Sequence, residues 1–321
     1  MKRTIRYETL IAKTVLNPVK APSMPFGWSI NPYRGCQHGC SFCYARSTHA
    51  FLGLDADDTF QNRIMIKGNA REALARQLKR MTPARLASLR AGHVVIGTAT
   101  DPYQPAEKDA KLTRGCLELL VEYGIPASVT TRSPLVLRDL DLLKKLPGGS
   151  VNISIGTLDP AIWRAFEPST PSPAKRMETL QELRSAGITA GVFIAPILPY
   201  ISDHPEKIYE LMAKAVKAGA SFVMTSFLRL STPEVKSWFM QTLSFHYPHL
   251  KRAYETLYAS SGTVPDSYKE PLSANYRDIR KRLGLQDGGG SGPVGNTAPP
   301  PGRQPKPPAA TESVEQLSFP F

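Results

Sequence analysis

The sequence predicts an α/β fold around a parallel sheet, arranged either as a partial β/α barrel or as a doubly wound sheet. Between about residues 28 and 229, short apolar runs alternate with helical patterns and give about six βα units. That is fewer than the eight units of a closed barrel. Both arrangements place chemistry at the carboxyl ends of the strands, where polar and cysteine-containing segments lie in this chain.

The units follow one another at regular intervals. The predicted strands are residues 27–31, 93–97, 127–131, 151–155, 188–195 and 221–228. The predicted helices between them are one with Thr113 as its N-cap, then 138–146, 173–186 and 205–217. Because each strand is followed by a crossover helix, the strands are expected to be parallel with right-handed connections.

The chain is expected to divide into five segments. Residues 233–285 are helical and aromatic, and residues 286–310 contain six Gly and seven Pro. The expected order is an N-terminal extension (1–26), the barrel core (27–232), a helical C-terminal cap (233–285), a disordered linker (286–310) and a C-terminal peptide (311–321).

Composition is ordinary for a globular protein, with 41% hydrophobic and 21% charged residues. No stretch approaches the ~20 apolar residues that span a bilayer, so no membrane contact is expected. The basic N-terminus lacks an apolar signal region, and the cytoplasm is the expected compartment. The net charge of +13 suits an anionic partner such as nucleic acid, although a basic protein without such a partner is the alternative.

Three of the four cysteines, Cys36, Cys40 and Cys43, follow the first predicted strand with the spacing C-x3-C-x2-C. They are too closely spaced for a disulfide framework and indicate metal binding or redox chemistry. A 4Fe–4S cluster has four irons that each need an outer ligand, so three cysteines leave one iron open to a small molecule. Gly35 and Gly39 suit a tightly wrapped loop because glycine tolerates positive φ.

The alternative is a binding module with a structural zinc ion that recruits a partner through its C-terminal peptide. Structural zinc needs four ligands, usually from two paired clusters. Cys116 stands alone on a predicted helix, and His38 lies awkwardly between two cysteines. The spacing therefore favours the open-site cluster.

The cysteine loop, with Phe42 before the third cysteine, resembles the signature of the radical S-adenosylmethionine superfamily. The resemblance implies a partial (β/α)6 barrel and S-adenosylmethionine chelated to the open iron by its amino and carboxylate groups. It also implies reductive cleavage to a 5′-deoxyadenosyl radical that abstracts hydrogen from a substrate, and an electron donor such as flavodoxin or ferredoxin.

A closer resemblance covers about half of the chain. Its blocks are NPYRG at 31–35, TDPYQP at 100–105, Glu107, LTR at 112–114, TRS at 131–133, SI at 154–155 and EP at 167–168. These resemble the spore-photoproduct-lyase-like group, whose members are often labelled DNA repair photolyases. A nucleic acid or nucleotide is therefore the leading substrate class, and modification of a protein or RNA is the alternative.

The same resemblance suggests cofactor contacts at the strand ends. Arg132 lies where spore lyases have a lysine facing the cofactor carboxylate, Ser154 where the group contacts the ribose or methionine, and Thr100 and Asp101 where polar groups meet the cofactor amine. The alternatives are a solvated Arg132, a Ser154 bonded to backbone and an Asp101 that caps the turn at Pro102.

One feature departs from the group. Spore photoproduct lyases use an extra cysteine near the second strand as a hydrogen donor, but residues 97–101 read GTATD. Cys116 is expected on the apolar face of its helix. The group label therefore does not specify thymine-dimer repair as the activity of this chain.

The C-terminal peptide ends in QLSFPF. It resembles the short peptide by which bacterial repair proteins bind the sliding DNA clamp, with Gln316 as a hydrogen-bonding residue and Leu317, Phe319 and Phe321 as apolar anchors. A tail that folds back on its own body, or a chance match, is the alternative.

Overall fold

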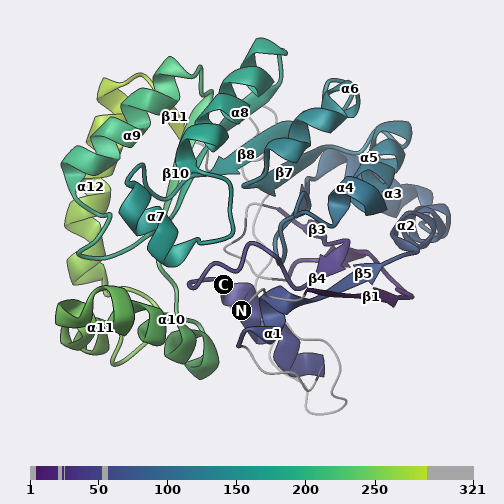
Figure 1. The fold of residues 1–321 in the computed structure, drawn as a ribbon. Helices are drawn as coiled ribbons and strands as arrows, with labels where there is room; N and C mark the ends of the chain where they lie inside the picture. Colours follow the sequence, from purple (N-terminus) through teal and green to yellow (C-terminus); the bar gives the residue numbers. More distant parts are fainter. Residues whose placement is uncertain (1–4, 21–23, 25, 53–56, 288–321) are drawn as a thin grey trace, which may run out of the picture.

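The structure confirms the predicted α/β fold, with helices packed outside a largely parallel sheet (Figure 1). The computed structural model describes residues 5–20, 24, 26–52 and 57–287. In spatial order the strands are β3 (Trp28–Ile30), β6 (Val94–Ile96), β7 (Ala127–Thr131), β8 (Ser150–Ser154), β9 (Thr189–Ile197) and β10 (Phe222–Phe227). β2 (Leu16–Pro18) pairs antiparallel with β3 at one edge, and β11 (Gln286–Asp287) pairs parallel with β10 at the other. The sheet therefore remains an open, partial (β/α)6 barrel.

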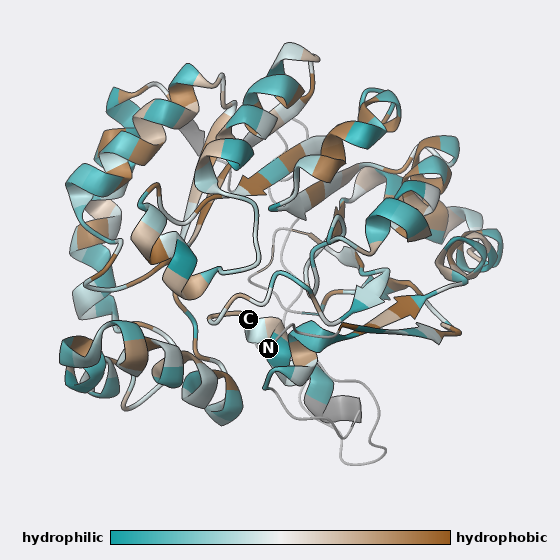
Figure 2. Ribbon diagram, in the orientation of Figure 1, coloured by the Kyte–Doolittle hydropathy of each residue, from teal (hydrophilic) through white to brown (hydrophobic). Residues whose placement is uncertain are grey.

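Helices cover the outer face of this sheet (Figure 1). They are α2 (Ala70–Lys79), α3 (Pro83–Ala91), α4 (Glu107–Ala110), α5 (Leu112–Glu122), α6 (Leu140–Leu143), α8 (Pro173–Ser185) and α9 (Pro205–Lys217). α3 and α8 begin with proline after a capping side chain: Thr82 and Ser172 each accept a hydrogen bond from the backbone N–H three residues later. Figure 2 shows that the helices have apolar and polar faces, as burial on one side requires.

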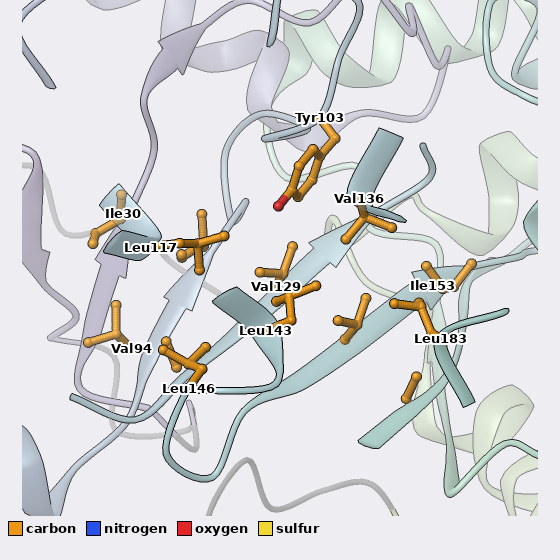
Figure 3. Packing of buried hydrophobic residues seen from close by; sticks show 14 of the residues in the cluster. Ile30, Val94, Tyr103, Leu117, Val129, Val136, Leu143, Leu146, Ile153 and Leu183 are labelled. Carbon is orange, nitrogen blue, oxygen red and sulfur yellow. The ribbon is translucent and has the colours of Figure 1, made fainter. Parts of the chain in front are cut away.

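The main core lies between the strands and these helices. Figure 3 shows Val94, Val129 and Ile153 of the strands packed among helix residues such as Leu117 and Leu183. All five side chains are at most 1% exposed. Each fully buried aliphatic side chain of this kind contributes about 1.5–3 kcal/mol to folding, so the core fixes the strands whose ends carry the site.

The C-terminal helices pack in two places. α10 (Pro233–His246) and α11 (Lys251–Leu257) cover a second apolar cluster that also includes Cys40, Phe42 and residues of α7 (Pro160–Phe166). α12 (Asp266–Arg282) packs against α9 and leads into β11. The cysteine loop is therefore in contact with the C-terminal helices as well as with the barrel.

Local structure differs from expectation at two helices. The N-cap of α5 is Lys111, not Thr113, because the buried Glu107 carboxylate accepts the N–H groups of Thr113 and Arg114. In place of a continuous helix over 138–146, a 3-10 helix (Pro134–Asp139), capped by Ser133, precedes the short α6.

The sequence patterns also missed a small sheet. In this sheet β5 (Arg63–Lys67) lies between β1 (Arg6–Leu10) and β4 (Tyr33–Arg34). β4 directly precedes the cysteine loop in the sequence. In the described ranges, no helix is both long and apolar enough to cross a membrane. The predicted clamp-binding residues Gln316, Leu317, Phe319 and Phe321 lie outside the described residues.

Candidate active site

The three clustered cysteines line one cavity of about 380 Å³ at the carboxyl ends of the strands. Cys36 and Cys40 are buried and Cys43 is partly buried, and all three are free thiols. Thr100, Asp101, Arg132 and Ser154 line the same cavity. The structure therefore brings the predicted cluster ligands and the predicted cofactor contacts together at one cavity.

The loop can wrap this way because of two glycines. Gly35 has φ +76° and Gly39 has φ +59°, a region that other residues rarely adopt. A Cβ on Gly35 would lie 2.7 Å from the Arg63 carbonyl oxygen, and one on Gly39 would lie 2.5 Å from Gln61 Oε1. A larger residue at Gly35 would collide with backbone, and at both positions the positive φ strains any residue other than glycine.

Arg46 stabilises the cysteine loop through hydrogen bonds to its backbone, a role that was not predicted from the sequence. Its side chain is fully buried, and its Nε donates to the Cys40 carbonyl at 3.2 Å while Nη2 donates to the Gly39 carbonyl at 3.1 Å. Nη2 also donates to Gln61 Oε1 at 2.8 Å, and the guanidinium lies over the Trp238 ring. Its position three residues after Cys43 was the only available signal.

Gln104 and Thr100, which follow β6 in the sequence, form hydrogen bonds with the cysteine loop. Gln104 Nε2 donates to the Gly35 carbonyl and to Thr100 Oγ1, and its Oε1 accepts the N–H of Gln37. Thr100 Oγ1 donates to the Gly35 carbonyl at 2.9 Å. The polar atoms of both side chains are thus engaged in fixing the first cysteine.

The Cys36 and Cys40 thiols suit a bound cluster because burial opposes their ionisation, which a metal would overcome. Burial raises the pKa of Cys36, and it raises the pKa of Cys40 to about 12 although Arg132 is close by. A metal deprotonates its thiol ligands outright and supplies the missing positive charge. In the described part of the chain, no three His, Cys, Asp or Glu side chains gather around one point as a single metal ion would need. Each cysteine of a 4Fe–4S cluster, by contrast, binds a separate iron.

Asp101 is buried beside the loop as a carboxylate. Its Oδ1 accepts from Thr131 Oγ1 and from the Tyr103 N–H, and its Oδ2 accepts from the Arg132 N–H at 2.7 Å. Burial raises the pKa of Asp101, but His38 and these hydrogen bonds outweigh burial and hold it at about 2. Asp101 therefore closes the turn, as the alternative expected, and also presents a negative charge at the cavity wall.

Arg132 is partly buried in the same wall. Its Nε lies 3.4 Å from Glu167 Oε2, its Nη2 donates to the Ala195 carbonyl at 3.3 Å, and its guanidinium lies 5.8 Å from the centre of the Phe42 ring. Glu167 is also paired with the buried Arg176, so Arg132 is one of two cations that share this carboxylate. Nη1 of Arg132 makes no hydrogen bond to the described residues and is available to a ligand.

Ser154 ends β8 and is 2% exposed. Its carbonyl accepts from Arg176 Nη1 at 3.0 Å, which fixes the strand end. Its hydroxyl has no hydrogen-bond partner among the residues described here. The other cysteine, Cys116, is fully buried on α5 in the main core, as expected.

A partial β/α barrel with three cysteines after its first strand defines a class of enzymes that hold a metallocofactor at the strand ends. The model of the Radical SAM superfamily matches residues 30–212. The chain therefore belongs to this superfamily and is a radical S-adenosylmethionine enzyme; the family implies an iron–sulfur cluster and S-adenosylmethionine.

Solved structures agree on the fold. Spore photoproduct lyase aligns with a TM-score of 0.59 and 16% identity over 86% of this chain and 79% of that chain. A further structure of that lyase, complexed with a dinucleoside spore photoproduct, aligns equally well. At this identity the likeness shows the fold alone.

Relatives by sequence include an uncharacterized protein of Mycobacterium tuberculosis. It is 34% identical over 285 residues, which are 85% of this chain and 82% of that protein. The radical SAM Nα-GlyT isomerase of Pseudomonas phage M6 is 25% identical over 79% of this chain and 51% of its own length. Both alignments cover more than three quarters of this chain.

Proposed function

We propose that Cys36, Cys40 and Cys43 hold a 4Fe–4S cluster whose fourth iron binds S-adenosylmethionine. The observation that carries this proposal is the one cavity lined by the three cysteines, two of them buried and one partly buried, and by the ends of the barrel strands. A 4Fe–4S cluster held by these cysteines would supply the electron for reductive cleavage of the cofactor. The chain's own residues orient the cofactor and keep water away from it.

The residues at the strand ends contact different groups of the cofactor. Arg132 pairs with its carboxylate through the free Nη1, since guanidinium and carboxylate form strong charge-assisted hydrogen bonds. Ser154 donates its unused hydroxyl to the ribose or methionine. Asp101 faces the amine with its carboxylate, and Thr100 positions the loop.

We propose a nucleic acid or nucleotide as the substrate. The net charge of +13 and the likeness to a lyase solved with a dinucleoside lesion support this class. Spore photoproduct repair itself is not proposed, because residues 97–101 carry no thiol and Cys116 is sealed in the core. An electron donor such as flavodoxin or ferredoxin in the cytoplasm would supply the reducing equivalents.

The cofactor part of the proposal is tested by anaerobic reconstitution. The protein should bind four irons and, with dithionite, slowly release 5′-deoxyadenosine and methionine without substrate. A colourless protein that binds one zinc ion would establish the zinc-module alternative instead.

The substrate part is tested with a deuterated single-stranded DNA oligonucleotide. Hydrogen abstraction from the nucleic acid transfers deuterium into 5′-deoxyadenosine, which mass spectrometry detects. Cofactor cleavage without any deuterium transfer, but with transfer from a deuterated peptide, would assign the enzyme to protein modification.

We also propose that the C-terminal peptide binds the sliding clamp. Deletion of residues 316–321 should abolish binding to the clamp and leave cofactor cleavage unchanged, as should the double change Leu317→Ala, Phe319→Ala. The expected affinity is micromolar because a short peptide loses ordering entropy when it binds. An isolated peptide that shows no binding in a titration would contradict this.

A further inference from the structure

Arg229 follows β10, the last barrel strand, and lines the cavity that the three cysteines line. β3, which leads into the cysteine loop, and β10 lie at opposite ends of the six-strand run. Arg229 therefore enters the cavity from the side farthest along the sheet from the cluster ligands.

The backbone around Arg229 is held on several sides. The Leu228 N–H donates to the Ile197 carbonyl at 3.0 Å, and the Leu228 carbonyl accepts from Tyr258 Oη at 3.0 Å. The Leu230 N–H donates to the Gly262 carbonyl at 2.7 Å. A Cβ on Gly262 would lie 2.5 Å from the Leu230 carbonyl oxygen, so only glycine permits this close approach.

The neighbours of Arg229 also fix its direction. Leu228 and Leu230 are 1% and 2% exposed, so both point into the protein. Side chains alternate along extended backbone, which places the partly buried Arg229 on the other side, toward the cavity. The Arg229 side chain therefore extends toward the cavity from backbone that is fixed by hydrogen bonds on both sides.

Among the described residues, none pairs with the charge of Arg229. Asp101 accepts three hydrogen bonds, and Arg132 lies beside Glu167. For the guanidinium of Arg229, the described residues provide neither a carboxylate within 4 Å nor a hydrogen-bond acceptor. Ser226 and Ser231 line the cavity next to it and add hydroxyl donors.

We propose that Arg229 binds a phosphate of the nucleic-acid substrate and thereby places a neighbouring nucleoside in the cavity. Guanidinium groups pair bidentately with phosphate, and a partly buried cation without a counter-ion is stabilised by an anionic ligand. This inference rests on the proposed function and specifies its substrate as a phosphodiester, not as a free base or nucleoside.

The test measures binding of a single-stranded DNA oligonucleotide to the reconstituted enzyme over a range of salt concentrations. Arg229→Gln should weaken binding by about ten-fold at low salt. It should also reduce the slope of log affinity against log salt by about 0.7, the value for one lost phosphate contact on a single strand. Arg229→Lys keeps the charge and should keep the slope.

Arg76→Gln on α2 is the matched control, because Arg76 is exposed and remote from the cavity. It loses the same charge and should change neither affinity nor slope. The affinity for S-adenosylmethionine is measured for each variant in parallel.

The outcomes separate the two proposals. A wild-type enzyme that cleaves the cofactor but does not bind the oligonucleotide overturns the proposed substrate. Wild-type binding with an unchanged slope in Arg229→Gln overturns only the role of Arg229. A fall in S-adenosylmethionine affinity as large as the fall in oligonucleotide affinity assigns Arg229 to the cofactor carboxylate and also overturns this inference.

Discussion

The cysteine loop and the strand-end wall face the same cavity but differ in how their polar groups are satisfied. In the loop, Arg46 and Gln104 direct their hydrogen bonds to the loop's own backbone. In the wall, the Ser154 hydroxyl and the Arg229 guanidinium have no partner within the described ranges. The loop hydrogen bonds therefore hold the shape of the loop, whereas the wall keeps a hydroxyl and a guanidinium that can pair with a ligand.

This comparison predicts two kinds of mutant. Substitutions in the loop should lower stability and cluster retention, whereas substitutions in the wall should lower ligand affinity at nearly constant stability. A loop variant that changes only affinity, or a wall variant that changes only stability, would remove the distinction.

The largest effect is expected from the ligands themselves. Replacement of Cys36, Cys40 or Cys43 by Ala should abolish the cluster, since no other thiol lines the cavity. Iron content and visible absorption after anaerobic reconstitution measure this. Cys116→Ala is the control and should retain its iron. Loss of iron from that variant would show that the three-cysteine site is wrong.

Arg46→Met should have the next largest effect. It leaves the Gly39, Cys40 and Asp57 carbonyls and Gln61 without a buried donor, which should lower the free energy of unfolding by about 3 kcal/mol or more. Denaturant unfolding of the apo protein measures this change. Arg76→Met, at an exposed position, should stay within about 0.5 kcal/mol of wild type, and equal effects from both variants would contradict the role of Arg46.

The sequence predicted the α/β class and its parallel strands because strand and helix periodicities are local signals, whereas the choice of a partial barrel over a doubly wound sheet came from the family resemblance. It predicted the cysteine site because the spacing is local too. It missed the supports of that site. Arg46 and Gln104 act through the folded positions of distant backbone groups, and their own neighbours in sequence do not distinguish them from exposed residues. Arg229 was missed for the same reason: its lack of a partner is a property of the fold.

A smaller effect is expected at Arg132, which belongs partly to each region. Arg132→Ala removes a charge-assisted pair with the cofactor and should weaken S-adenosylmethionine binding by about 1.5–3 kcal/mol, or about 10- to 100-fold. Stability should change little because Glu167 keeps its pairing with Arg176. Titration of the reconstituted protein measures the affinity, and an unchanged affinity would show that Arg132 has only a structural role.

The smallest effects are expected from the removal of either of two hydroxyl groups that line the same cavity. Ser154→Ala removes a hydroxyl with no described partner, so it should leave the free energy of unfolding unchanged and weaken S-adenosylmethionine binding by about two- to ten-fold. Thr100→Val removes a hydroxyl that bonds Gly35 and Gln104, so it should lower stability by about 1 kcal/mol. Both variants are nearly isosteric, and therefore packing changes do not obscure the result. If Ser154→Ala destabilises the fold as much as Thr100→Val does, Ser154 is part of the scaffold and the wall is not reserved for ligands.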